Sequence, residues 1–253
     1  MIFRGILSSS YVFLGKGFGG NRSLDSKERF PPKTKEANAV DRFTEIDRET
    51  WPRKALFELY TKAWMEMTYS ATVKLRAERL VKRQKERGQK LTPALIYLFT
   101  REISRDRAFT TAIRDGTLGY WDRLQPVYPV LNDDGTFTFH TARVEGDFPG
   151  FYDAYLREQA ENAGKRGAYA SNDVPVNGYT ISVMPFLAFD SFSFSLKNIK
   201  HYFAPIISIG KYDESFLLPV AATVNHAVCD GYHLSELFRR LQDAFDHPDA
   251  WLD

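Results

Sequence analysis

The chain contains the sequence FLLPVAATVN at residues 216–225, and HAVCDG follows it directly at residues 226–231. A continuous apolar run of this length, bounded by turn residues, is typical of a buried β-strand. The dipeptide Asp230-Gly231 is a turn signal that ends the strand, and the amphipathic pattern of residues 233–245 predicts a closing helix. His226 is therefore predicted to stand where a buried strand ends and a helix is about to begin.

Working outward from this strand, strand-like and helical patterns follow one another without strict alternation. Further strands are predicted at residues 69–75, 118–121, 125–131, 135–140, 179–184, 191–196 and 205–211. Helices are predicted at residues 51–65, 76–87, 93–103 and 148–162, of which the second is charged and expected to be exposed. This arrangement predicts an α+β fold with a single domain, built around one mixed β-sheet flanked by helices.

Composition excludes several classes of protein. The 253 residues carry 34 basic and 32 acidic side chains, a formal net charge of +2, so nucleic acid is not an expected partner. There is no apolar stretch long enough for a membrane-spanning helix. Cys229 is the only cysteine, which rules out an intramolecular disulfide and favours a cytoplasmic protein. The five histidines are scattered without the paired spacing of a zinc site, so no metal is expected.

The beginning of the sequence differs from the rest. Residues 1–40 are rich in Gly, Ser and Lys and lack sustained periodicity, which predicts a flexible N-terminal extension. A natural extension, an upstream start and a non-native addition all stay open as its origin. Its first apolar residues are interrupted by serines, glycines and Lys16, so they make at best a weak candidate for a signal peptide. Residues 41–253 are expected to form the functional domain.

His226 is the candidate for chemistry. A histidine at a strand end can point into a cleft, and an imidazole, which titrates near neutral pH, can take a proton from a hydroxyl in a transition state. Asp230 lies too far along the chain to reach His226 by local geometry and could instead pair with a distant Arg. The alternative is that His226 is a structural residue before an ordinary Asp-Gly turn.

The run HAVCDG, followed by Tyr232-His233, resembles the signature of the type A chloramphenicol acetyltransferases. Four further blocks resemble the same family in the same order: Trp51-Pro52-Arg53-Lys54 with Phe57 and Tyr60, Arg114-Asp115-Gly116 with Trp121-Asp122, Ile181-Ser182-Val183-Met184-Pro185 with Phe189-Asp190-Ser191-Phe192, and residues 202–208 with Lys211-Tyr212. The five blocks together extend over about residues 43–245, leaving only the N-terminal extension outside the resemblance.

The resemblance implies a chloramphenicol acetyltransferase-like, CoA-dependent acyltransferase fold in a homotrimer whose sheet continues across subunits. It also implies an active site at each subunit interface, where acetyl-CoA and chloramphenicol enter from opposite sides. The acetyl group would pass directly to the 3-hydroxyl of chloramphenicol, with His226 as general base, and the modification would confer antibiotic resistance. No metal takes part.

The resemblance also implies roles for individual residues. Ser182 would stabilise the oxyanion of the tetrahedral intermediate, and the hydroxyl of Ser208 would hold a water near it. Asp230 and Arg53 would form a buried ion pair that orders the loop behind His226. The expected contacts to the acceptor are Tyr60, Met67, Tyr69 and Phe194. The expected wall of the CoA channel includes Phe186 and Tyr212.

The sequence departs from the family at two places. Asn225 stands where a second His usually precedes the catalytic one, and the segment from Trp64 to Tyr69 carries an extra residue. These changes keep two alternatives open. One is an O-acetyltransferase of the same fold that acts on another hydroxylated small molecule, and the other is a non-catalytic trimeric ligand binder.

Overall fold

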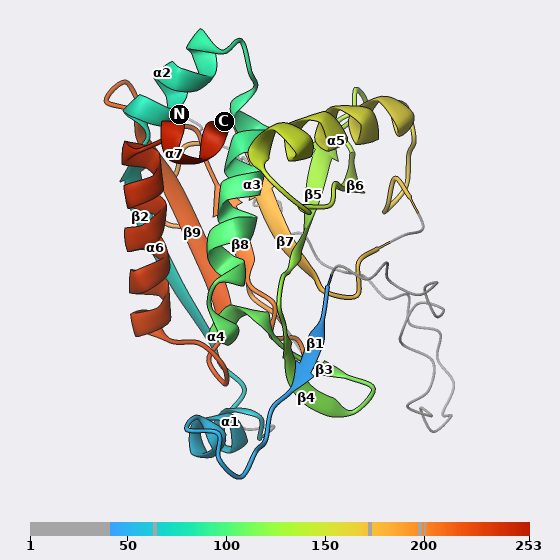
Figure 1. Ribbon diagram of the computed structural model, residues 1–253, viewed down its shortest axis with the longest axis vertical. Coiled ribbons are helices and arrows are strands. Elements are labelled where there is room, and N and C mark those ends of the chain that lie inside the picture. The colour runs from blue at the N-terminus through green and yellow to red at the C-terminus, as the bar shows by residue number, and fades with distance from the viewer. Residues whose placement is uncertain (1–40, 63–64, 172–173, 197–198, 200) are drawn as a thin grey trace, which may run out of the picture. The chain divides into compact units, whose positions relative to one another are not determined.

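A computed structural model of the chain describes residues 41–62, 65–171, 174–196, 199 and 201–253. The predicted extension over residues 1–40 lies outside these residues, and so does Trp64 in the segment with the extra residue. The strands and helices of the described part are drawn in Figure 1.

The main sheet has six strands in the order β2-β9-β8-β7-β5-β6. Their bounds are Thr68–Arg76 (β2), Leu217–Asn225 (β9), Ile206–Ile209 (β8), Gly178–Val183 (β7), Gln125–Leu131 (β5) and Phe137–Thr141 (β6). β5, β7 and β8 run parallel, whereas the other pairings are antiparallel, so the prediction of a mixed sheet is confirmed. The apolar run that includes β9 lies inside the sheet, which explains why all but its first residue are buried.

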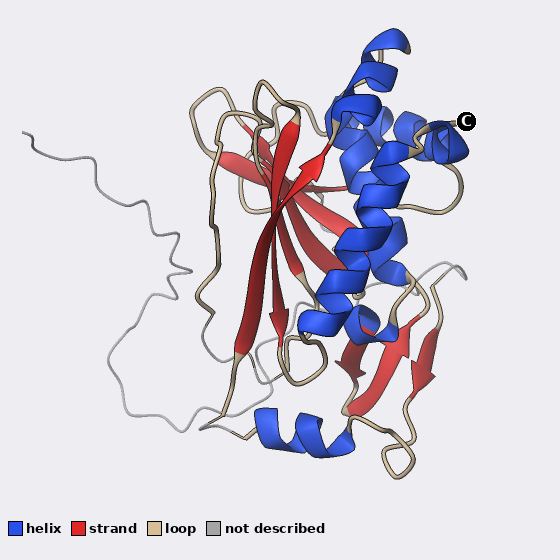
Figure 2. Cartoon of the chain, turned by 90° about the vertical axis from the view of Figure 1, so that its left-hand side faces the viewer, coloured by secondary structure: helices blue, strands red, loops and turns tan. Residues whose placement is uncertain are grey.

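Helices cover one face of this sheet, as Figures 1 and 2 show. They are α2 (Glu78–Glu86), α3 (Leu91–Ser104), α5 (Phe148–Glu161), α6 (Gly231–Asp246) and the short α7 (Asp249–Leu252). α3 contacts both α5 and α6, so ten of its fourteen residues are buried, among them the predicted Ala94, Leu95, Leu98 and Phe99. None of the described helices is both long and apolar enough to cross a membrane.

A second, three-stranded sheet corrects the prediction of a single sheet. It has the order β1-β4-β3 and consists of Phe43–Glu45, Thr117–Trp121 and Thr111–Arg114, the last directly preceded by the short α4 (Arg107–Thr110). Of these strands, only β4 was predicted, because the other two are three or four residues long. Asp115 and Gly116 both have positive φ angles, which suits the tight hairpin that joins β3 to β4.

Three other predicted elements need correction. Residues 191–196 form no strand, although their Phe and Leu side chains are half-buried and their Ser side chains exposed, as alternation predicts. Thr72 in β2 connects this segment to the sheet, because its hydroxyl forms hydrogen bonds with the backbone of Phe192. The first helix is limited to α1 (Lys54–Tyr60), with Arg53 at its N-cap. Finally, α2 is not fully exposed, because it buries Leu80, Val81 and Gln84.

Candidate active site

His226 follows the last residue of β9, as predicted, and is half-buried. Its backbone N–H donates to the carbonyl oxygen of Met67 at 2.9 Å, which ties it to the chain just before β2. Its ring is stacked on Tyr60, with centroids 4.5 Å apart, and lies 5.4 Å from the ring of Tyr69. The two tyrosines therefore restrict the orientation of the imidazole.

A hydrogen bond fixes the tautomer of this imidazole. His226 Nδ1 lies 3.0 Å from the carbonyl oxygen of Cys229. A carbonyl oxygen can only accept, so Nδ1 carries the proton of this bond. In the neutral ring the lone pair is then on Nε2, where it can accept a proton from a bound hydroxyl.

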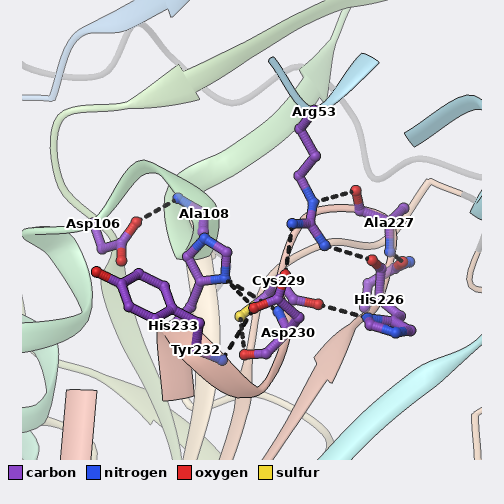
Figure 3. Close-up of polar contacts among 10 residues, drawn as sticks. Arg53, Asp106, Ala108, His226, Ala227, Cys229, Asp230, Tyr232 and His233 are labelled. Carbon is purple, nitrogen blue, oxygen red and sulfur yellow. Dashed lines mark hydrogen bonds and ion pairs between the residues drawn. The ribbon is translucent and has the colours of Figure 1, made fainter. Parts of the chain in front are cut away.

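Arg53 holds the turn that follows His226 (Figure 3). Its Nη2 donates to the carbonyl oxygen of His226 and its Nε to that of Ala227, each at 2.9 Å. Its Nη1 donates to Asp230 Oδ2, also at 2.9 Å. One guanidinium at the start of α1 thus binds three groups of the 226–230 segment, a fork geometry that lysine could not reproduce.

Asp230 is the N-cap of α6. Its Oδ1 accepts from the backbone N–H of Tyr232 at 3.1 Å and lies 2.9 Å from His233 Nδ1. Partial burial acts to raise the pKa of this carboxyl, but the hydrogen bond from Arg53 and the nearby His233 outweigh it and lower the pKa to about 2. The predicted pair with Arg53 is thus present, although it is half-buried rather than buried, with side chains 13% and 30% exposed.

Gly231 leaves room for one of the aromatic rings beside His226. A Cβ atom at this position would lie 2.7 Å from the hydroxyl oxygen of Tyr69, closer than real contacts allow. Glycine therefore lets the Tyr69 ring approach both the start of α6 and the imidazole.

The two serines expected to act on the intermediate lie elsewhere in the same sheet. Ser182 in β7 is the register partner of Ser208 in β8, which in turn is opposite Ala221 in β9. Ala221 lies four residues before the end of β9, about 14 Å along the strand. Ser208 is 1% exposed, and its Oγ has no hydrogen-bond partner among the described residues. Within one chain, the serines and His226 do not form one cluster.

The residues expected to bind the two substrates also lie at different ends of the main sheet. Met67 is exposed close to His226, whereas Phe186 and Tyr212 follow the carboxyl ends of β7 and β8. Because β9 runs antiparallel to β8, it begins at that same end of the sheet. His226 follows the other end of β9 and so lies at the opposite end of the sheet. Phe186 is 70% exposed, and Tyr212 is stacked on Phe216 with centroids 5.6 Å apart.

Phe194 lies in the segment that was wrongly predicted as a strand. It is half-buried and makes an edge contact with Phe192, with ring centroids 5.2 Å apart. Among the residues that the structure describes, the Phe194 ring contacts Phe192 and not the rings of Tyr60, Tyr69 or His226.

Several groups of the site could not be found from the sequence. The carbonyl oxygens of Met67 and Cys229 fix the backbone and ring of His226, but a backbone group leaves no residue-type signal. His233 does have such a signal, because it stands three residues after an N-cap Asp, where side chains complete a capping box. Among the described residues, no group of three or more His, Cys, Asp or Glu side chains could hold a metal ion.

The fold is also found in solved structures of other proteins. A solved chloramphenicol acetyltransferase superposes with a TM-score of 0.73 at 24% identity, covering 80% of this chain and 99% of that one. A truncated catalytic core of the 2-oxoacid dehydrogenase multienzyme complex from Thermoplasma acidophilum superposes with a TM-score of 0.56 at 13% identity, covering 78% and 96%. The described part of the chain therefore shares the fold of these two structures.

Sequence comparison then gives the family. The sequence profile of chloramphenicol acetyltransferase matches residues 41–242. A chloramphenicol acetyltransferase of Staphylococcus aureus is 35% identical over 215 residues, which cover 83% of this chain and 99% of the relative. One of Clostridium perfringens is 36% identical over 216 residues, covering 83% and 98%. The chain belongs to the chloramphenicol acetyltransferase family.

Proposed function

We propose that the protein transfers the acetyl group of acetyl-CoA to the 3-hydroxyl of chloramphenicol, with His226 as general base. The observation that carries the proposal is the 3.0 Å contact between His226 Nδ1 and the carbonyl oxygen of Cys229. Because Nδ1 keeps its proton to donate this hydrogen bond, the free lone pair of the neutral ring is on Nε2. The relatives named chloramphenicol acetyltransferase support the choice of acceptor.

The chemistry is a direct transfer. Nε2 takes the proton of the hydroxyl as its oxygen attacks the thioester carbonyl carbon, and the hydroxyl of Ser182 donates to the resulting oxyanion. When this intermediate collapses, the carbon–sulfur bond breaks, and the proton on Nε2 passes to the leaving CoA sulfur. Ser208, with its buried hydroxyl, is suited to holding a water beside the oxyanion.

The site is built from two copies of the chain. His226 and Ser182 lie towards opposite strand ends of one sheet. His226 therefore meets Ser182 only if a second copy of the chain supplies one of them. A head-to-tail contact closes into a ring when its rotation allows, and the ring in this proposal is a homotrimer. β2 and β6 are the edge strands of the main sheet, and an edge strand can pair with a strand of another chain, so the sheet continues across the subunits.

Each substrate has its own side of this interface. Tyr60, Met67 and Tyr69 beside His226, together with Phe194 from its own segment, provide flat or apolar surfaces for the aromatic acceptor. Phe186 and Tyr212, at the other end of the sheet, line the channel for acetyl-CoA, where the exposed ring of Phe186 offers an apolar surface to the cofactor. Residues 41–253 form the acetyltransferase domain that carries both.

The test is a spectrophotometric assay for free CoA thiol with acetyl-CoA and chloramphenicol. Thiol release that depends on chloramphenicol is expected, and His226→Ala should abolish it while the assembly keeps its size on a gel-filtration column. Release only with other alcohols would assign the same chemistry to another acceptor. No release with any alcohol would contradict the proposal and favour a non-catalytic binder.

A further inference from the structure

Asn225, which directly precedes His226, makes three side-chain hydrogen bonds. At position 225 the family usually has a histidine. We infer that Asn225 is a positioning residue that locks the His226 turn and clamps it to the backbone of Ile199 and Tyr202. The inference rests on the proposed function, in which His226 is the base. The positioning of His226 in this chain then depends on the side-chain amide of Asn225.

The bonds of Asn225 occupy both ends of its amide. Oδ1 accepts from the backbone N–H of Ala227 at 2.9 Å. Nδ2 donates to the carbonyl oxygens of Ile199 at 3.0 Å and Tyr202 at 3.1 Å. One acceptor and two donors are what an amide offers and a carboxylate does not. With the residue only 6% exposed, water cannot readily replace these bonds.

The bond to Ala227 completes the hydrogen bonding of the catalytic turn. The backbone N–H of His226 bonds to Met67, and the carbonyl oxygens of His226 and Ala227 bond to Arg53. The N–H of Ala227 is the remaining group of these two residues, and Asn225 binds it. The main-chain carbonyl of Asn225 also accepts from the N–H groups of Val228 and Cys229. Asn225 therefore sets the shape of the turn that brings the Cys229 carbonyl to His226 Nδ1.

The other two bonds connect this turn to α1 through aromatic packing. Phe203 follows Tyr202 and lies 5.5 Å, centroid to centroid, from Phe57 in the middle of α1. Tyr60, at the end of the same helix, stacks on the His226 ring. A change at Asn225 would therefore loosen the turn and the support of the helix that orients the imidazole.

The experiment follows the imidazole itself. Selective ¹⁵N-histidine labelling of the whole protein gives separate imidazole N–H signals for its five histidines, and His226→Gln identifies the signal of His226. In the wild type, Nδ1–H should exchange slowly with solvent. Asn225→Leu, which keeps the approximate shape but removes all three bonds, should speed this exchange at least about tenfold and lower kcat about tenfold or more, with the KM for acetyl-CoA within about twofold.

Asn177→Leu is the matched control. Asn177 is equally buried, at 4% exposed, and its Nδ2 donates to the Arg123 carbonyl at 2.8 Å, away from the turn. This variant should keep the His226 signal, its exchange rate and kcat even if its melting temperature falls. If Asn177→Leu alters them as much as Asn225→Leu does, the effect is one of general stability and the inference is wrong.

A milder variant covers the case in which Asn225→Leu does not fold. Asn225→Asp keeps an acceptor for Ala227 but sets an oxygen against the Ile199 and Tyr202 carbonyls, so faster exchange and lower kcat are again expected. Wild-type exchange and kcat in this variant would overturn the clamp. If the exchange results hold but the wild type releases no CoA thiol with any alcohol, the positioning stands and the proposed function fails.

Discussion

Arg53 and Asp230 are separated by 177 positions in the sequence, yet Arg53 Nη1 lies 2.9 Å from Asp230 Oδ2. The same guanidinium binds the carbonyl oxygens of His226 and Ala227, and the same carboxylate caps α6. The ion pair thus joins the start of one helix to the start of another across the turn that carries the proposed base. Its contribution is to hold that turn, with no proton transfer required of Asp230.

Asp230→Asn should reduce the free energy of unfolding by about 1–2 kcal/mol, less than for a fully buried pair, because both side chains are partly exposed. Urea unfolding of Asp230→Asn, Arg53→Gln and the double variant measures the coupling between them. We expect a coupling free energy of about 1 kcal/mol. Additive effects of the two single substitutions would show that the contact contributes nothing.

The charge of Asp230 also makes a pH dependence measurable. The folded carboxyl has a pKa of about 2, below the usual value of 3.8, so it stays charged while the unfolded carboxyl takes up a proton. Its stabilising effect is therefore complete above about pH 5 and lost as the pH falls through 4 towards 2. The difference in unfolding free energy between wild type and Asp230→Asn should shrink from pH 6 to pH 3. A difference that stays constant over this range would contradict the lowered pKa.

Ser182→Ala should lower kcat by about a hundredfold with little change in the KM for acetyl-CoA, because an oxyanion donor acts mainly in the transition state. Ser208→Ala is the neighbouring comparison. Its buried Oγ has no hydrogen-bond partner among the described residues, so its removal should not destabilise the fold and should lower kcat less. Steady-state kinetics of both variants provide the test. A rise in KM with unchanged kcat in Ser182→Ala would make Ser182 a ground-state binding residue.

Deletion of residues 1–40 should leave activity and melting temperature nearly unchanged, since the family match begins at residue 41. Deletion through Glu45 is the contrasting variant. It removes β1 and Asp41, whose carboxylate is 2% exposed and bonded to Arg143 and Gln125, so it should lower the melting temperature by several degrees, about 1–3 kcal/mol of stability. The melting temperatures of the two truncated proteins provide the test. If the shorter deletion lowered the melting temperature as much as the longer one, the domain boundary at residue 41 would be wrong.

Much of the main sheet could be predicted from the sequence because its strands are apolar and its helices periodic. β5 matches its predicted bounds, and β9 and α5 match theirs to within one residue. The small sheet was missed because strands as short as β1 carry too few residues for a pattern. Residues 191–196 show the opposite failure: their alternation is real, but alternation reports side-chain burial and not backbone pairing.

The site was predictable as a set of residue types but not as an arrangement. The resemblance implied roles for His226 and Ser182 and an active site between subunits, whereas the separation of the two residues within one chain is seen in the register of β7, β8 and β9. Tyr60 and Tyr69, expected against the acceptor, both pack on the His226 ring, a contact between residues far apart in sequence. Asn225 was recognised as a departure, but its three partners are backbone groups, which a sequence does not reveal.

The central claim is that His226 of one copy acts together with Ser182 of another. It is tested most directly by co-assembling His226→Ala and Ser182→Ala subunits in equal amounts and measuring chloramphenicol-dependent release of CoA thiol. Random trimers should regain up to about a quarter of wild-type activity, because a quarter of their interfaces then combine an intact His226 with an intact Ser182. Activity no higher than the average of the two separate variants would contradict the shared site.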